Sequence, residues 1–173
     1  MTTRHPWSLL GLLLFAAAVT MPGVVSHGAP VTLTAGAQCR ASQLAVTATA
    51  VSPADTHRGV LLHFTLAPDS RACSLVGYPD VDSGAGGPLL HARRTPTGYL
   101  GGLPIGVNAP QVVDLVPGQA ATAVVEGSAV NADGSPCPTY TGLRVTPPNT
   151  TTAGMVAATI DTCSLQVHPV TSG

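Results

Sequence analysis

Apolar and polar residues alternate along two early stretches of the chain, 43–51 and 59–67. In the second stretch, Leu62, Phe64 and Leu66 fall on one side and the residues between them on the other. This alternation is typical of half-buried β-strands. Further short apolar stretches predict strands at 89–92, 105–107, 111–115, 119–127, 141–146, 155–160 and 164–168.

Turn-forming residues separate these predicted strands. Glycine and proline occur 19 and 16 times, and no helical period follows residue 26. Many short strands joined by proline- and glycine-rich turns predict an all-β fold, an antiparallel β-sandwich. Residues 83–88 read as a tight glycine turn, whereas 93–108 read as a long loop.

The first 26 residues have the order of a secretory signal peptide. Arg4 and His5 precede the apolar run 9–19, and Pro22-Gly23 and small residues follow. The run is shorter than the roughly 20 residues that span a bilayer, so no stable transmembrane segment is expected after cleavage. We predict cleavage after Ser26, with an uncleaved membrane anchor as the alternative. Residues 27–38 then form a flexible lead-in, and 39–170 a single domain.

Charge and composition exclude several classes of protein. The chain has no lysine, and its seven basic residues are all arginine. Glu126 is the only glutamate among eight acidic residues. So few charged residues argue against a nucleic-acid binder, which needs a basic face. The plentiful valine, leucine and alanine argue against long disorder.

Four cysteines in an exported chain predict two disulfides. Antiparallel pairing of 43–51 with 59–67, about the turn near Asp55, places Cys39 and Cys73 near cross-strand positions. Pairing of 141–146 with the last strand places Cys137 opposite Cys163. We therefore predict these two bonds. A four-cysteine metal site is disfavoured because the chain has no Cys-x-x-Cys pair and the compartment is oxidising.

Three motifs resemble one family. They are Cys-Ser-Leu-Val-Gly-Tyr-Pro-Asp-Val at 73–81, Leu-Val-Pro-Gly at 115–118, and Leu-Arg-Val-Thr-Pro-Pro at 143–148 after Cys137. In order and spacing they resemble the DUF4232 domain, found in exported and lipid-anchored proteins of actinobacteria. The resemblance covers roughly Cys39 to Val170. It implies an immunoglobulin-like sandwich with cystines at or beyond the cell envelope, and no catalytic residues.

The chain departs from the family pattern in two places. It has Ala67-Pro68-Asp69 where members often carry an asparagine, and no cysteine follows the leader closely. The second departure puts lipid attachment to the envelope in doubt.

Within the first motif, Gly77, Tyr78 and Pro79 predict a structural corner. Glycine permits a backbone conformation that a side chain hinders, and proline fixes the exit direction. We predict that Tyr78 is buried with its hydroxyl bonded to nearby backbone, as in tyrosine corners. The alternative role for Tyr78 is to contact a ligand beside Tyr99.

Candidate catalytic or metal-binding groups are few. His57, His63, His91 and His168 lack the spacing of convergent ligands, although folding could gather His63 with His91 or His168. Asp80 and Asp82 share one face of an extended strand and could suit Ca²⁺. More often, such histidines and carboxylates are simply solvated. The chain also lacks the Gly-x-Ser-x-Gly elbow that positions a nucleophilic serine.

Loop 93–108 is the predicted interaction site, because long loops in compact domains often carry function. It holds Arg93, Arg94 and Tyr99. We therefore predict a non-enzymatic, cofactor-free binding module, secreted or at the cell envelope, whose partner is a protein or an envelope component. The alternatives are a histidine-based metal-binding protein or enzyme and a purely structural cell-wall protein.

Overall fold

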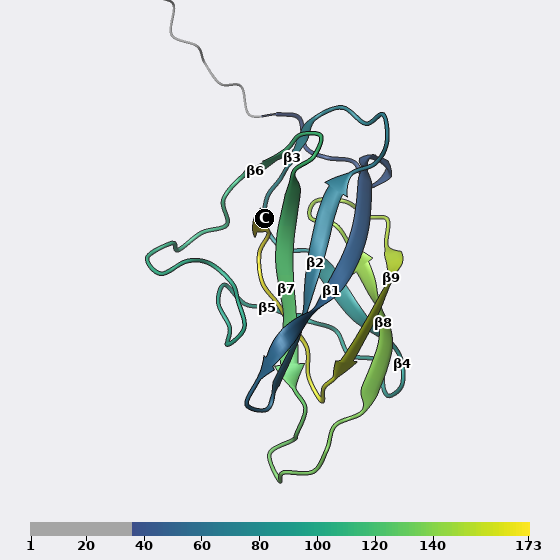
Figure 1. Ribbon diagram of the computed structural model, residues 1–173, viewed down its shortest axis with the longest axis vertical. Coiled ribbons are helices and arrows are strands. Elements are labelled where there is room, and N and C mark those ends of the chain that lie inside the picture. The colour runs from purple at the N-terminus through teal and green to yellow at the C-terminus, as the bar shows by residue number, and fades with distance from the viewer. Residues whose placement is uncertain (1–35) are drawn as a thin grey trace, which may run out of the picture. The chain divides into compact units, whose positions relative to one another are not determined.

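The structure is a computed structural model that describes residues 36–173 (Figure 1). The predicted signal peptide and residues 27–35 of the predicted lead-in lie outside the described residues. The described chain forms the 3₁₀ turn η1 Ala41–Gln43 and the strands β1 Leu44–Ala54, β2 His57–Leu66, β3 Cys73–Leu75, β4 Asp80–Ala85, β5 Arg93–Arg94, β6 Val113–Leu115, β7 Ala120–Ser128, β8 Thr139–Thr146, β9 Gly154–Asp161, β10 Gln166–Val167 and β11 Thr171–Ser172. The all-β prediction is confirmed. Over this same range, no helix is long and apolar enough to cross a membrane.

The strands form three sheets. The largest has the order β1-β2-β7-β10-β5, and β11 also pairs with β7. A second sheet has the order β4-β8-β9, and β3 pairs with β6 as a short ribbon. Strand β9 of the second sheet lies next to β1 of the first (Figure 1). The ladders between these strands are antiparallel, except that β5 runs parallel to β10. Outside the named strands, an isolated bridge from Gln38 to Ser74 is also parallel.

Both hairpin registers follow the alternation in the sequence. Leu44 faces Leu66 across β1 and β2, and Thr139 faces Asp161 across β8 and β9, where a bulge then shifts the register. A one-residue slip would turn the core-facing side chains outward, so burial of one face fixes these registers.

The structure contains the two predicted disulfides. Cys39 is bonded to Cys73, with 4.9 Å between their Cα atoms. Cys137 is bonded to Cys163, with 5.0 Å between Cα atoms. The first bond therefore ties the segment before β1 to the beginning of β3.

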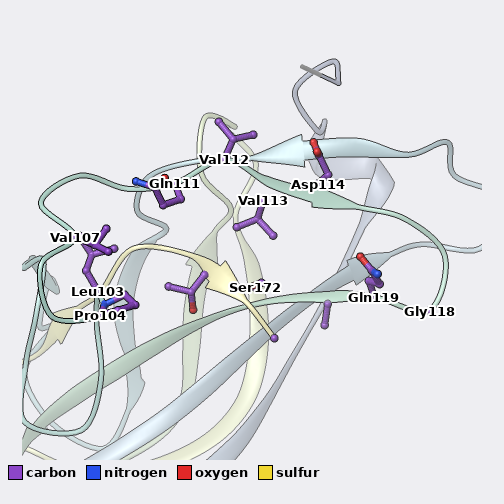
Figure 2. Close-up of a pocket in the computed structure, with 13 residues that line it drawn as sticks. Leu103, Pro104, Val107, Gln111, Val112, Val113, Asp114, Gly118, Gln119 and Ser172 are labelled. Carbon is purple, nitrogen blue, oxygen red and sulfur yellow. The ribbon is translucent and has the colours of Figure 1, made fainter. Parts of the chain in front are cut away.

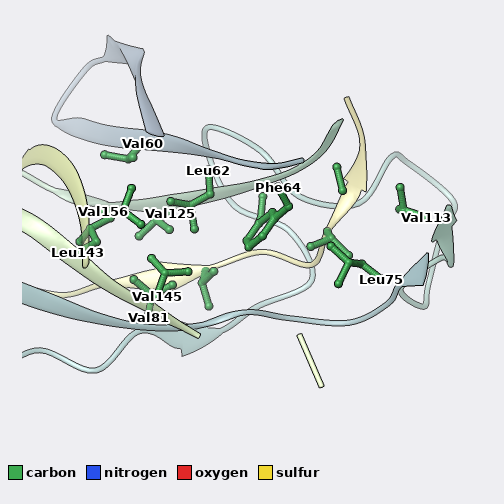
Figure 3. Packing of buried hydrophobic residues seen from close by; sticks show 14 of the residues in the cluster. Val60, Leu62, Phe64, Leu75, Val81, Val113, Val125, Leu143, Val145 and Val156 are labelled. Carbon is green, nitrogen blue, oxygen red and sulfur yellow. The ribbon is translucent and has the colours of Figure 1, made fainter. Parts of the chain in front are cut away.

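The hydrophobic core lies between the sheets. Val60, Leu62 and Phe64 of β2 are almost fully buried, as are Leu143 and Val145 of β8. Figure 3 shows these side chains pointing toward one another from the two sides of the core. Burying each such side chain contributes about 1.5–3 kcal/mol relative to leaving it exposed, so the core holds the sheets together.

Two predicted strands are wrong. Residues 89–92 pair only through an isolated bridge from His91 to Asp82. Residues 105–107 contain no strand, and Ile105 is fully exposed. The glycine turn was predicted at 83–88, but β4 continues to Ala85, so the turn begins later than predicted. Ala85 pairs with Thr141 of β8. A partner strand overrides the local turn preference there.

The corner after β3 has the predicted backbone conformation, but Tyr78 is not buried as predicted. Gly77 has a φ of 96°, in the region that favours glycine, and its carbonyl accepts a hydrogen bond from the Val170 N–H at 2.8 Å. Pro79 is buried. Tyr78, however, is only half-buried, and its hydroxyl has no hydrogen-bond partner within residues 36–173. The predicted burial of Tyr78 is therefore wrong, and the main-chain bond between Val170 and Gly77 holds this corner instead.

Tyr140 of β8 has the environment that was predicted for Tyr78. It is 1% exposed, and its hydroxyl donates to the carbonyl of Pro88 at 2.8 Å. We expect Tyr140→Phe to lower the free energy of unfolding by about 1 kcal/mol, the net value of one such bond. Urea unfolding measures this change. Tyr99→Phe is the control, because its ring is 63% exposed and surface changes cost within about 0.5 kcal/mol. Equal effects of the two variants would contradict the assignment.

Candidate functional site

The predicted interaction loop contains an ordered hairpin at residues 96–103. Gly98 N–H donates to the Gly101 carbonyl at 2.8 Å, and Leu103 N–H donates to the Pro96 carbonyl at 2.8 Å. Leu103 is buried at the base of this hairpin. Backbone bonds therefore hold the hairpin closed, and only the part of the loop after it is extended over the surface.

The carboxylate of Glu126 anchors this hairpin to β7. Its two oxygens accept the main-chain N–H groups of Tyr99, at 2.8 Å, and Leu100, at 2.5 Å. Gln166 of β10 donates to the same carboxylate at 3.2 Å. Glu126 is 0% exposed, and a buried carboxylate is tolerated only when donors surround it. The only glutamate in the chain thus serves as an acceptor for loop backbone.

His168 completes the buried polar group. Its Nδ1 lies 3.0 Å from the carbonyl oxygen of Thr95, which can only accept, so Nδ1 donates there. Its Nε2 lies 3.5 Å from a carboxylate oxygen of Glu126. The ring is 1% exposed. His168 therefore holds the beginning of the loop at Thr95, while its buried Nε2 lies beside Glu126 without a hydrogen-bond partner among residues 36–173.

The close approach of loop and anchor explains one glycine. A Cβ atom on Gly98 would overlap the Glu126 carboxylate and the His168 ring. Glycine lets the hairpin backbone reach the carboxylate. The sequence alone singles out neither Gly98 nor Glu126 for this role.

The three residues predicted to make the interaction loop do not form one surface. Arg93 and Arg94 make the short strand β5, and the Arg94 guanidinium pairs with Asp80 at 2.5 Å. Tyr99 lies in the hairpin, where its ring stacks on His57 with 4.0 Å between centroids and 3° between planes. Arg94 and Tyr99 thus each have a side-chain partner within the domain.

A groove follows the hairpin, and we refer to it as the loop groove. Figure 2 shows it between the extended part of the loop, β6, the beginning of β7 and β11. Its volume is about 640 Å³. Its lining consists of Leu103, Pro104, Val107, Gln111, Val112, Val113, Asp114, Gly118, Gln119, Ala120, Thr171, Ser172 and Gly173.

Apolar side chains dominate the loop side of this groove. Val112 is 55% exposed, and Ile105 on the adjoining loop is fully exposed. Asp114 contributes the only charged side chain of the lining, and within residues 36–173 it forms no ion pair. The groove can therefore accept an apolar segment that carries a positive charge.

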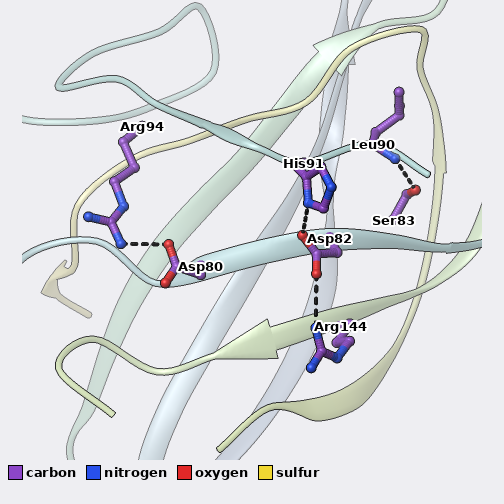
Figure 4. A network of polar contacts seen from close by, with 7 residues as sticks. All are labelled: Asp80, Asp82, Ser83, Leu90, His91, Arg94 and Arg144. Carbon is purple, nitrogen blue, oxygen red and sulfur yellow. Dashed lines mark hydrogen bonds and ion pairs between the residues drawn. The ribbon is translucent and has the colours of Figure 1, made fainter. Parts of the chain in front are cut away.

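The pair Asp80 and Asp82 lies on one face of β4 but does not form an open cation site. Asp80 pairs with Arg94, and Asp82 contacts His91 at 2.7 Å and Arg144 at 3.1 Å (Figure 4). Each carboxylate already has a cationic or imidazole partner. The Ca²⁺ hypothesis for this pair loses support because these groups already contact three of the four carboxylate oxygens.

The histidines do not form a metal centre in the described chain. His63 lies 2.9 Å from the Thr49 hydroxyl, His91 contacts Asp82, and His168 faces Glu126. Among residues 36–173, no three histidine, cysteine or acidic residues lie close enough together to hold a metal ion. Each histidine has a separate local partner.

Three comparisons with known proteins complete the description of the site. A family model described as a domain of unknown function (DUF4232) matches residues 39–171. No curated protein and no solved structure matches the chain. The matched range includes both disulfides, the Glu126 anchor and most of the groove lining.

Proposed function

This chain belongs to the DUF4232 family, and we propose that it is a non-enzymatic binding module built on an immunoglobulin-like β-sandwich. An apolar segment of the partner occupies the loop groove. The single observation that carries it is the groove itself, about 640 Å³ in volume and bordered by exposed apolar side chains. Apolar concave surfaces of this kind are preferred binding sites.

The two disulfides indicate an extracytoplasmic setting, because such bonds persist in oxidising compartments. Our proposal adds that residues 1–26 direct export and are then removed. The partner would accordingly be an exported protein or a protein of the cell envelope.

A binding role also agrees with how the ionisable groups are used. Glu126 and His168 are buried in the loop anchor, and Asp80 and Asp82 are paired with neighbouring side chains. A general acid or base must reach the proton of a bound substrate. The carboxylate that borders the groove is Asp114, and it fits better as a contact for a basic side chain.

Selection from a phage library of random dodecapeptides against the oxidised protein tests this proposal. We expect enriched peptides to bind the loop groove, so that Val112→Ser weakens their binding by about tenfold, the equivalent of losing roughly 1.4 kcal/mol of apolar burial. Fluorescence anisotropy of labelled peptides measures the affinity.

Leu89→Ser is the matched control for this experiment. Leu89 is 62% exposed, close to the 55% of Val112, but it does not line the groove. Its substitution should leave peptide binding unchanged. Equal effects of the two substitutions, or a selection that enriches no peptide, would overturn the proposed function.

A further inference from the structure

We infer that the loop groove binds its partner by β-strand addition, with the partner's extended segment pairing to the free edges of β11 and β6. This inference rests on the proposed function and specifies the kind of segment that is bound. It comes from the directions of main-chain groups on two strands that border the groove. Strand addition supplies affinity through main-chain hydrogen bonds and specificity through alternate side chains.

The first free edge belongs to β11. Thr171 faces Thr122 and Ser172 faces Ala121 in β7, while Gly173 N–H donates to the Ala120 carbonyl at 3.0 Å. In an antiparallel pair, hydrogen-bonded and non-hydrogen-bonded residues alternate. Gly173 and Thr171 therefore bond to β7, and Ser172 directs its N–H and carbonyl away from β7. Ser172 lines the groove and is exposed.

The second free edge belongs to β6. Ser74 of β3 donates its N–H to Ala37 and accepts from Cys39, both at 3.0 Å, so its main chain points away from β6. Asp114 faces Ser74 in the β3–β6 ladder. By the same alternation, Asp114 directs its own N–H and carbonyl away from β3. Asp114 is exposed and lines the groove with Ser172.

The chain itself leaves the β11 edge open at Ser172. Strand β5 runs beside β10 on the side away from β7, and its ladder ends where Thr95 N–H donates to Val167 at 3.0 Å. At Pro96 the chain turns into the hairpin that Glu126 anchors. At Ser172 the position that a longer β5 would occupy beside β11 is therefore left free, whereas Val170, two residues earlier on the same edge, donates to the Gly77 carbonyl at 2.8 Å. Within residues 36–173, β11 pairs with β7 alone.

The lining defines the chemistry of the added strand. Leu103, Val107 and Val113 offer apolar contacts along the groove, and Asp114 has the only charged side chain of the lining (Figure 2). Side chains alternate between the two faces of a strand, so apolar residues at every second position would face this lining. Charge complementarity with Asp114 then selects a segment that also carries an arginine or lysine. The occupant is thus an extended, apolar and basic peptide.

The experiment uses peptides enriched by the dodecapeptide selection, with the full oxidised domain. We expect apolar residues at alternate positions and at least one basic residue. Ser172→Pro removes only an outward-facing N–H, which an edge strand tolerates, and it should weaken binding about tenfold. Ser172→Ala, which keeps the N–H, should change binding less than about twofold. Asp114→Asn should weaken binding of basic peptides, but not of their Arg→Ala or Lys→Ala versions.

A second arm does not depend on how the protein variants fold. N-methylation of single peptide amides removes main-chain donors, and strand addition predicts that binding falls at alternate positions by about tenfold. The same small loss at every position would overturn strand addition. If peptides depend on Val112 but bind Ser172→Pro and Ser172→Ala equally, the groove is a binding site and strand addition is wrong. If no peptide is enriched, the proposed function fails and the inference fails with it.

Discussion

Glu126→Gln should lower the free energy of unfolding by about 2–4 kcal/mol and release the 96–103 hairpin. The carboxylate accepts the N–H groups of Tyr99 and Leu100 on separate oxygens. Glutamine has the same shape but only one acceptor oxygen, so one loop N–H would face an NH₂ donor. Hydrogen bonds to a charged group contribute about 1.5–3 kcal/mol, and an unsatisfied buried donor adds its desolvation penalty.

Urea unfolding measures the loss of stability, and hydrogen exchange of the Tyr99 and Leu100 amides measures the release of the hairpin. Asp80→Asn is the matched control, because it also removes one carboxylate charge. Both side chains of its ion pair with Arg94 are more than half exposed. The free energy of unfolding should therefore change by less than about 1 kcal/mol. Unchanged amide exchange at Tyr99 and Leu100 in Glu126→Gln would refute the anchor.

The second large effect concerns the Cys39–Cys73 bond. Cys39→Ala and Cys73→Ala should each lower the free energy of unfolding by about 3 kcal/mol, and the double variant should lose little more than either one. The bond closes a loop over a sequence separation of 34, and cross-links of such loops contribute about 2–4 kcal/mol in the chain-entropy account. Both residues are almost fully buried.

Denaturant unfolding of the three variants, in oxidising buffer, measures this coupling. Cys137→Ala and Cys163→Ala form the comparison pair, with a separation of 26. Removing one cysteine from each bond should give nearly additive losses, because the two disulfides are distinct cross-links. Full additivity between Cys39→Ala and Cys73→Ala would contradict the idea that the pair acts as one unit.

The anchor gives the proposed binding function a physical basis. Glu126 and His168 hold the beginning of the long loop in place, so the loop side of the groove is preorganised. Preorganisation reduces the entropy lost when a partner binds. Loss of the anchor should therefore weaken peptide binding through Leu103 and Val107, even though Glu126 does not line the groove.

The long strands and both disulfides could be predicted from the sequence because their causes are local. Alternation around Leu62 and Phe64 defines a buried face, and a hairpin pairs residues symmetrically about its turn. The pair Cys137–Cys163 follows from that symmetry, because Thr139 faces Asp161. The pair Cys39–Cys73 was also predicted, but in the structure the segment before β1 runs parallel to β3 at a bridge between Gln38 and Ser74. Both hydrophobic alternation and hairpin symmetry depend only on residues close in sequence and on one hydrophobic face.

The short strands and the candidate site depend on contacts between distant parts of the chain. Strands β5, β10 and β11 are each two residues long, which is too short to show alternation. They form because β10 and β11 pair with the backbone of β7, and β5 pairs with β10. Tyr140, rather than Tyr78, occupies a core-facing position, and the Pro88 carbonyl satisfies its buried hydroxyl there.

The sequence by itself determined an all-β, doubly cross-linked domain, because hydrophobic alternation and hairpin symmetry are properties of short stretches. Only the tertiary structure decided that Glu126 would accept the backbone of Tyr99 and Leu100, across a separation of more than twenty residues. It also decided that Ser172 and Asp114 would border one groove. The physical reason is that a buried charge and an unpaired strand edge are defined by what surrounds them in space.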